Sequence, residues 1–100
     1  MKGSLRAALD PASVAIIGAS ENPNKIGGRP LLYLQRFGYR GRIFPINPSR
    51  KEVQGLSCYP ALDALPEVPE MVIIAVPGPA AEDAIAASAA RGVKVAVLMA

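Results

Sequence analysis

Uninterrupted apolar runs, rather than alternating ones, mark the predicted strands of this chain. Val14–Ile17, Met71–Val76 and Lys94–Met99 are largely aliphatic, with few polar residues between the apolar ones. Such runs are typical of strands that are covered on both faces, as in a parallel sheet. Arg42–Ile46 is predicted as a fourth strand, although Pro45 within it cannot donate a ladder hydrogen bond. We expect the missing N–H to face an unpaired side, or the strand to be irregular there.

Helical patterns separate these strands. The first helix is predicted to begin around Gly27–Arg29, with Pro30 in its first turn, where a missing N–H costs nothing. Gly38 is expected just beyond its last residue, at the position where helices commonly end in glycine. One apolar face is predicted from the helical spacing of Leu31, Leu34 and Phe37.

A second helix is predicted over Pro79–Arg91. Proline stands near its start, alanines fill its body, and Arg91-Gly92 closes it. Glu82 and Asp83 are expected in its first turns, where they would complement the helix dipole rather than act as an acid/base pair.

The remaining connections are predicted to be short. Glu52–Tyr59 is expected to be a loop with a very short strand at Ser57–Tyr59, and Ala61–Leu65 to make about one helical turn between prolines. Ser4–Leu9 is expected to form a short helix or arm.

Strands that alternate with helices favour a parallel, right-handed α/β sheet with helices on both faces, in a Rossmann-like order. In that order Met71–Val76 lies beside Val14–Ile17, on the side away from Arg42–Ile46. The crevice between Met71–Val76 and Val14–Ile17 is then a topological switch point. Gly18-Ala19-Ser20 and Val76-Pro77 are predicted to be its two walls.

Length and composition limit the chemistry of this segment. The 100 residues are expected to form one domain, residues 1–100, and a last strand with no covering helix suggests the amino-terminal part of a longer chain. With no histidine and one cysteine, Cys58, the segment has no disulfide, histidine zinc site or histidine-based triad. The net charge is only +3, and no apolar run is long enough to cross a bilayer. We expect a cytoplasmic protein with no nucleic-acid or membrane partner and no metal site.

The loop after the first strand is composed like a phosphate-binding turn, but it departs from two common motifs. Ser20 replaces the second glycine of G-x-G-x-x-G, and G-x-x-x-x-G-K-[ST] is absent. The second strand ends in Asn47-Pro48 with no acid to hold ribose hydroxyls, and the cations Arg50 and Lys51 follow. This composition suits a ribose that carries its own phosphate, so NADP and coenzyme A (CoA) are both candidates. Arg50 could give a bidentate contact and Lys51 a point charge.

Five segments in this order carry a resemblance to a known family. They are Ser13–Ser20, Pro23–Gly28, Gly41–Pro48, Gly55–Pro60 and Ile74–Pro77. Together they resemble the amino-terminal CoA-binding domain of NDP-forming acyl-CoA synthetases. This is the acetate–CoA ligase (ADP-forming) group, which is related to the succinyl-CoA synthetase α subunit. The resemblance implies a full enzyme that interconverts acyl-CoA, ADP and phosphate with acid, CoA and ATP.

The resemblance also implies which residues contact CoA, as a substrate. The loop from Gly18 to Lys25 would cradle the CoA phosphates, with the Lys25 N–H a better candidate than its side chain. Val76-Pro77 would border the adenine, and Arg50 falls where the succinyl enzyme's pattern has a lysine. The predicted CoA-binding residues are Gly18, Ala19, Ser20, Lys25, Gly27, Asn47, Pro48, Arg50, Lys51, Val76 and Pro77.

No catalytic residue is predicted in this segment, because the family's phosphorylated histidine is absent from it. The resemblance places that histidine, an ATP-grasp domain, and the sites for ATP or ADP and Mg beyond Ala100, in the same chain or a partner chain, with an oligomer as one option. Two other functions stay open. One is a CoA-sensing module, either in a protein lysine acetyltransferase or as a stand-alone protein. The other is an NADP-binding oxidoreductase domain.

Overall fold

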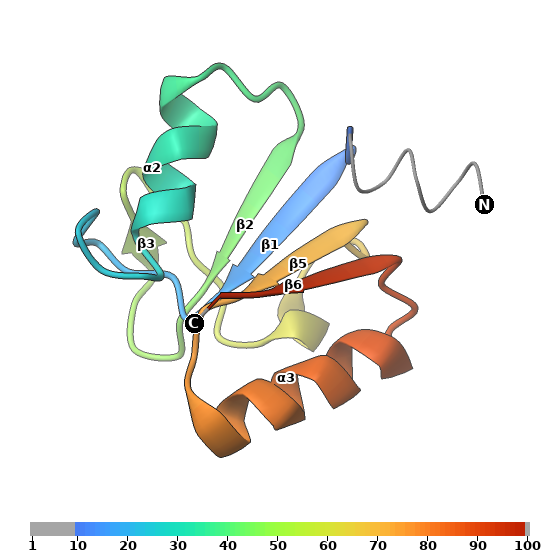
Figure 1. Cartoon of the computed structure of the whole chain (residues 1–100). Coiled ribbons are helices and arrows are strands. Elements are labelled where there is room, and N and C mark those ends of the chain that lie inside the picture. The colour runs from blue at the N-terminus through green and yellow to red at the C-terminus, as the bar shows by residue number, and fades with distance from the viewer. Residues whose placement is uncertain (1–9, 100) are drawn as a thin grey trace.

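The computed structural model describes residues 10–99, which form a parallel sheet with helices packed against it (Figure 1). In chain order the elements are β1 (Ser13–Ile17), α2 (Arg29–Arg36), β2 (Arg42–Ile46), β3 (Glu52–Val53), β4 (Leu56–Ser57), the 3-10 helix η1 (Leu62–Ala64), β5 (Met71–Ile74), α3 (Gly78–Ala90) and β6 (Val95–Leu98). The helix or arm predicted over Ser4–Leu9 lies outside the described residues.

The main sheet has four parallel strands in the order β2-β1-β5-β6. This order confirms the predicted Rossmann-like arrangement, in which the strand at Met71 lies beside β1 on the side away from β2. Ile17 at the end of β1 is level with Ile46 of β2 and with Ile74 of β5. Three strands therefore end at the same edge of the sheet.

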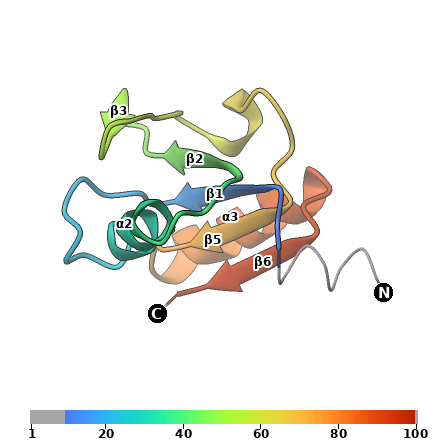
Figure 2. The ribbon, with the colours of Figure 1, turned by 90° about the horizontal axis from the view of Figure 1, so that it is seen from above.

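The two long helices lie on opposite faces of this sheet, as Figures 1 and 2 show when they are compared. Successive side chains of β1 point to opposite faces of the sheet. Val14 and Ile16 pack in a buried cluster with Leu31 of α2, while Ala15 belongs to the buried cluster that contains Ala81 of α3. The apolar run of β1 is continuous because both of its faces are buried.

Pro45 fits in β2 because β2 is an edge strand of the main sheet. A strand residue points its N–H and C=O to the same side, and the Pro45 carbonyl oxygen accepts a hydrogen bond from the Tyr59 N–H at 2.9 Å, away from β1. The missing N–H of Pro45 therefore faces away from the β1 ladder, although that side is not unpaired, because Tyr59 forms a β-bridge with Ile46 there.

Two details of the predicted helices are wrong. α2 ends at Arg36, so Phe37 is not on its buried face and is 77% exposed. α3 begins at Gly78, and its first turn contains no acidic residue, so Glu82 and Asp83 lie too far along to complement the dipole at its start. Gly38 has a φ of +75° just past the end of α2, which confirms its predicted position.

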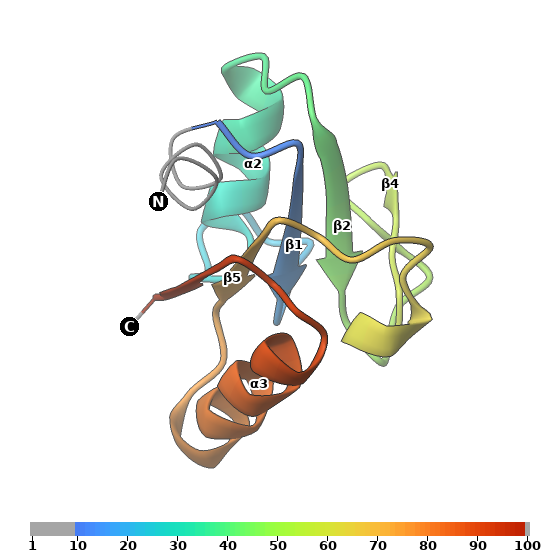
Figure 3. The same ribbon diagram turned by 90° about the vertical axis from the view of Figure 1, so that its right-hand side faces the viewer.

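The segment predicted as a loop with one short strand is a two-stranded hairpin instead. β3 and β4 pair antiparallel, with Val53 opposite Leu56 and a two-residue turn between them. Val53 is fully buried and anchors the hairpin to the α2 side of the core. Figure 3 shows β4 beside β2, at the edge of the main sheet. In residues 10–99, none of the helices has the length and apolar character needed to span a membrane.

Candidate functional site

The carboxyl ends of β1, β2 and β5 define the candidate site (Figure 1). The strand order reverses between β1 and β5, which is where parallel α/β sheets form ligand crevices. Gly18 follows β1 with a φ of +87°, and a Cβ there would lie 2.7 Å from both the Ala75 carbonyl oxygen and Val76 Cγ1. The two predicted walls of the crevice therefore meet at its base, and only glycine fits there.

Hydrogen bonds within the protein occupy the first N–H groups of the loop. Gly18 and Ala19 both donate to the Ile46 carbonyl oxygen at 3.1 Å, and Ser20 donates to the Gly27 carbonyl oxygen at 3.2 Å. These bonds join the loop to the end of β2 and to the start of α2. The backbone N–H groups of these three residues therefore shape the site and are not free to bind a ligand. Within residues 10–99, the Ser20 hydroxyl accepts the Asn22 N–H, and its own proton is still available for donation.

The free backbone donors of the loop are at other positions. The Lys25 N–H donates to the Asn22 carbonyl oxygen at 3.1 Å, so it is already engaged in a turn, while the Lys25 side chain is exposed. Within residues 10–99, the N–H groups of Glu21, Ile26 and Gly27 have no hydrogen-bond acceptor. Two of these three lie just before α2, where the dipole of the helix favours an anion.

The paired glycines before α2 are required by close packing. A Cβ on Gly27 would collide with the Gly18 carbonyl oxygen, and a Cβ on Gly28 would collide with the Asn22 carbonyl oxygen. Both glycines are buried. They let the start of α2 come close to the loop after β1. The outgoing limb of that loop, at Ser20, can then pair with its returning limb, at Gly27.

Asn47 connects β2 to the loop through both ends of its side-chain amide. Its Nδ2 donates to the Ala19 carbonyl oxygen at 3.0 Å, and its Oδ1 accepts the Ser49 N–H at 2.8 Å. Its own N–H donates to the Tyr59 carbonyl oxygen at 2.9 Å. The structure therefore shows Asn47 positioning the residues around it.

Two cations line a groove beyond the end of β2. Arg50 and Lys51 share a groove of about 330 Å³ with Pro48, Ser49, Cys58 and Pro60. The Arg50 side chain is 48% exposed, and its Nη2 lies 3.5 Å from Glu21 Oε1. Lys51 has no ion-pair partner within the described part of the chain. The groove thus combines one weakly paired cation with one unpaired cation.

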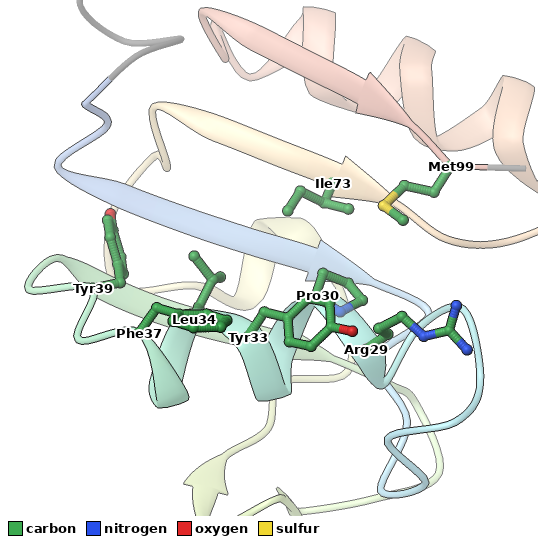
Figure 4. Close-up of a pocket in the computed structure, with 8 residues that line it drawn as sticks. All are labelled: Arg29, Pro30, Tyr33, Leu34, Phe37, Tyr39, Ile73 and Met99. Carbon is green, nitrogen blue, oxygen red and sulfur yellow. The ribbon is translucent and has the colours of Figure 1, made fainter.

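The predicted adenine contacts, Val76 and Pro77, and a second pocket lie away from these cations. Val76 is half-buried beside α3, and Pro77 is exposed just before that helix. Figure 4 shows a larger pocket, of about 510 Å³, along α2. Its lining is apolar apart from the Arg29 guanidinium and the tyrosine hydroxyls, so it does not suit a polyphosphate. The residues that line it are Arg29, Pro30, Tyr33, Leu34, Phe37, Tyr39, Ile73 and Met99.

Gln54 is a residue at this site that the sequence patterns do not reveal. It stands in the turn between β3 and β4, and its Nε2 donates to the carbonyl oxygens of Ser20 at 2.9 Å and Gly28 at 3.0 Å. Its N–H donates to Glu21 Oε1 at 2.9 Å. Gly55 between two short apolar stretches was the available signal for a hairpin, but not for these contacts.

Cys58 is not activated for nucleophilic chemistry. Burial raises the pKa of its thiol, and this effect exceeds the opposing effects of nearby backbone hydrogen bonds and of Arg50. A protonated thiol is a poor nucleophile. In the described residues, no cluster of three His, Cys, Asp or Glu side chains could hold a metal ion.

The strand order, the glycine-bearing loop and the cationic groove define a Rossmann-like α/β domain of the kind that binds phosphate-bearing ligands. Residues 12–100 match the protein family described as a CoA binding domain, and the chain belongs to that family.

The chain resembles the CoA-binding domain of ADP-forming acyl-CoA synthetases. It is 38% identical over 95 residues to acetate–CoA ligase [ADP-forming] II of Archaeoglobus fulgidus, covering 95% of this chain and 14% of the ligase. It is 34% identical to the α subunit of acetate–CoA ligase [ADP-forming] I of Pyrococcus furiosus, covering 92% of this chain and 21% of the subunit.

A solved structure shares the fold. It is the acetyl-coenzyme A synthetase 1 of Ca. Korarchaeum cryptofilum in complex with phosphate and ADP, with a TM-score of 0.74 and 32% identity. The match covers 89% of this chain and 18% of that one. In all three comparisons this chain spans about a fifth or less of the length of the protein it matches.

Proposed function

We propose that this chain binds CoA across the carboxyl ends of β1, β2 and β5, as the CoA-binding part of an ADP-forming acyl-CoA synthetase. The observation that carries the site is the groove beyond β2, where Arg50 and Lys51 follow a strand whose last residues include no Asp or Glu. Parallel α/β domains hold the adenosine ribose at this place. A 3′-phosphate on that ribose would give Lys51 a counter-charge and would compete with the Glu21 carboxylate for Arg50.

The contacts are divided among the loops. The pyrophosphate accepts hydrogen bonds from the free N–H groups of Glu21, Ile26 and Gly27 and from the Ser20 hydroxyl. These groups are chosen because the neighbouring N–H groups of the loop already have acceptors within the protein. Gly18 and Ala19 give the loop its path. The Lys25 side chain, exposed on the same loop, adds a cation near the phosphates.

The adenosine contacts lie on either side of the strand ends. Arg50 and Lys51 hold the 3′-phosphate, with Pro48 and Asn47 beside the ribose, and Asn47 also positions this segment. Val76 and Pro77 border the adenine from the end of β5.

The reaction itself belongs to further domains. Because the chain has no histidine, a phosphohistidine that relays phosphate must come from elsewhere in the enzyme. The relatives are much longer than this chain, and one of them is named as an α subunit. We propose that ATP-grasp and histidine-bearing domains, in the same chain or a partner chain, bind ATP, ADP and Mg. We also propose that the enzyme acts in the cytoplasm.

Calorimetry with CoA, 3′-dephospho-CoA and NADPH tests the site. We expect CoA to bind, and loss of the 3′-phosphate to weaken binding by about 10- to 100-fold, as removal of a charge-assisted hydrogen bond does. Arg50→Ala should weaken the binding of CoA and leave the binding of 3′-dephospho-CoA nearly unchanged.

Arg40→Ala is the matched control, since Arg40 is exposed between α2 and β2 at the opposite end of the strands. It should leave the affinity for every ligand unchanged. Binding of NADPH without CoA would contradict the proposed function. Equal affinities for CoA and dephospho-CoA would contradict the role of the two cations.

A further inference from the structure

Gln54 adopts a backbone conformation that a glutamine rarely takes. Its φ is +49°, and within residues 10–99 it is the one non-glycine residue with a positive φ. Gly55, the second residue of the turn, has a φ of +82°. Two-residue hairpin turns with two positive φ angles favour asparagine, aspartate or glycine at the first position. The Gln54 side chain must therefore make contacts that offset its strained backbone.

Those contacts bridge the two limbs of the loop that follows β1. The Gln54 amide donates to the carbonyl oxygen of Ser20 on the outgoing limb and to that of Gly28 on the returning limb, at 2.9 and 3.0 Å. Both N–H bonds of the amide are thus directed into the loop. The limbs also pair with each other, since the Ser20 N–H donates to the Gly27 carbonyl oxygen at 3.2 Å.

The bond to Ser20 has a consequence for the next residue. In a trans peptide, the C=O of one residue and the N–H of the next point in opposite directions. The bond from Gln54 fixes the direction of the Ser20 carbonyl, so it also turns the Glu21 N–H away from the hairpin. That N–H has no acceptor within the described part of the chain. Gln54 therefore sets the direction of a free donor of the loop.

The same turn is linked to the cationic groove. The Gln54 N–H donates to Glu21 Oε1 at 2.9 Å, and that oxygen lies 3.5 Å from Arg50 Nη2. Arg50 lies two residues before β3, and its Nε donates to the Glu52 carbonyl oxygen at 3.2 Å. The loop and the groove are thus held at a fixed separation through one hairpin.

We propose that Gln54 is a positioning residue for anion binding, which fixes the loop after β1 and its distance from Arg50. This role rests on the proposed function, because the anions in question are the phosphates of CoA. Gln54 does not touch the ligand. Its contribution is to hold the free Glu21 N–H and the Arg50 side chain ready for two phosphates of the same molecule.

Two substitutions separate positioning from stability. Gln54→Gly removes the amide and also relieves the left-handed backbone, so the fold is expected to keep a urea midpoint close to that of the wild type. Gln54→Leu removes the amide at similar side-chain size and keeps the strain. If Gln54 only stabilised the hairpin, affinity in these two variants would follow stability, and Gln54→Gly would bind like the wild type.

Calorimetry measures the binding of both variants. We expect each to bind CoA about tenfold more weakly, as the loss of two neutral hydrogen bonds would give, and to lose a smaller factor for 3′-dephospho-CoA, which has no phosphate for Arg50 to hold. Gln35→Ala is the control, since Gln35 makes one long hydrogen bond of 3.4 Å to the Gln54 carbonyl oxygen. It should change the affinity less than twofold. Wild-type affinity in Gln54→Gly and Gln54→Leu overturns the positioning role while the proposed function stands.

A second measurement tests whether Gln54 orients the loop without using CoA. It therefore stays informative if the wild type fails to bind CoA, a result that would refute the proposed function. Amide ¹H–¹⁵N spectra of the ligand-free protein should show Gln54→Gly shifting the Glu21 and Arg29 amides, whose peptide groups contain the two bonded carbonyls. The Arg40 amide serves as the distant reference. Unchanged Glu21 and Arg29 resonances would show that Gln54 does not orient the loop.

Discussion

At the residue scale, the Glu21 carboxylate lies beside the Arg50 guanidinium, to which the proposed function assigns a ligand phosphate. Its Oε1 accepts the Gln54 N–H at 2.9 Å and lies 3.5 Å from Arg50 Nη2, and its side chain is 52% exposed. An exposed ion pair of this kind is worth roughly 0–1 kcal/mol, because water screens both charges. The carboxylate therefore competes weakly with an incoming phosphate for Arg50.

Glu21→Gln should strengthen CoA binding. The amide oxygen still accepts the Gln54 N–H, but the charge that competes for Arg50 is gone, so we expect an affinity gain of about two- to fivefold. The gain should be smaller for 3′-dephospho-CoA and at higher salt, as calorimetry can measure. Glu67→Gln is the control, because Glu67 pairs with Arg42 at the other end of β2. A weaker affinity for CoA in Glu21→Gln would show that the carboxylate supports the site instead.

Cys58 offers a chemical reporter of the groove. Because burial raises the pKa of its thiol, alkylation by iodoacetamide should be slow at neutral pH and accelerate only above the ordinary thiol pKa. CoA should slow it further, since Cys58 lines the groove with Arg50 and Lys51. Cys58 is the one cysteine of the chain, so mass spectrometry reads the reaction directly. Equal rates with and without saturating CoA would mean that the ligand does not cover this groove.

The same pKa shift has a defined effect on stability. The folded state favours the protonated thiol, so this contribution is fully present below the pKa of the unfolded chain. It is lost as the pH rises through that value and up to the raised pKa of the folded protein. Cys58→Ser should flatten this part of the stability profile in urea titrations at alkaline pH.

At the element scale, the start of α2 and the loop after β1 form one packed unit. Gly27→Ala would push a Cβ into the Gly18 carbonyl oxygen, so either the helix or the loop must move. We expect a loss of about 1–3 kcal/mol in the free energy of unfolding, as for other overpacked sites, and weaker CoA binding by the protein that remains folded. Urea titration and calorimetry give the two numbers.

Gly38→Ala is a matched control for that substitution. A Cβ at Gly38 meets no atom, but its φ of +75° makes alanine strained. Gly38→Ala should therefore lower stability without changing the affinity of the folded protein. If Gly27→Ala binds CoA like the wild type, close packing of the loop is not needed for the site.

The elements were predictable where they depend on local sequence. Apolar runs placed β1 and β5, and glycine with proline marked the limits of α2 and α3. The hydrogen-bond acceptor of each loop N–H group was not predictable, because Gly18 and Ala19 both donate to Ile46 on a neighbouring strand, and this contact exists only once the chain has folded.

The same reason explains the residues that the sequence patterns missed. Nothing near Gln54 in the sequence shows that its amide reaches Ser20, 34 residues away. Phe37 has the spacing of a core residue, but the helix ends before it, so the spacing no longer applies. Site residues defined by long-range hydrogen bonds need the fold before they can be found.

At the scale of the whole molecule, the ligand is expected to contact several separate segments of the chain at once. The sheet core is shared by α2 on one face and α3 on the other, while the proposed CoA contacts lie on the loops after β1, β2 and β5. A ligand that contacts all three exists only with the folded state, so its binding energy adds to the stability of the whole domain.

CoA at about 100 times its dissociation constant should raise the free energy of unfolding by about 2.7 kcal/mol. With a urea dependence of about 1–3 kcal/mol/M for a small domain, the midpoint should rise by about 1–3 M. The same concentration of 3′-dephospho-CoA should give a smaller rise, because it lacks the phosphate assigned to Arg50 and Lys51. In Arg50→Ala the difference between the two rises should shrink, since one of the two cations that distinguish the ligands has been removed. A large rise with CoA that survives unchanged in Arg50→Ala would place the 3′-phosphate elsewhere on the molecule.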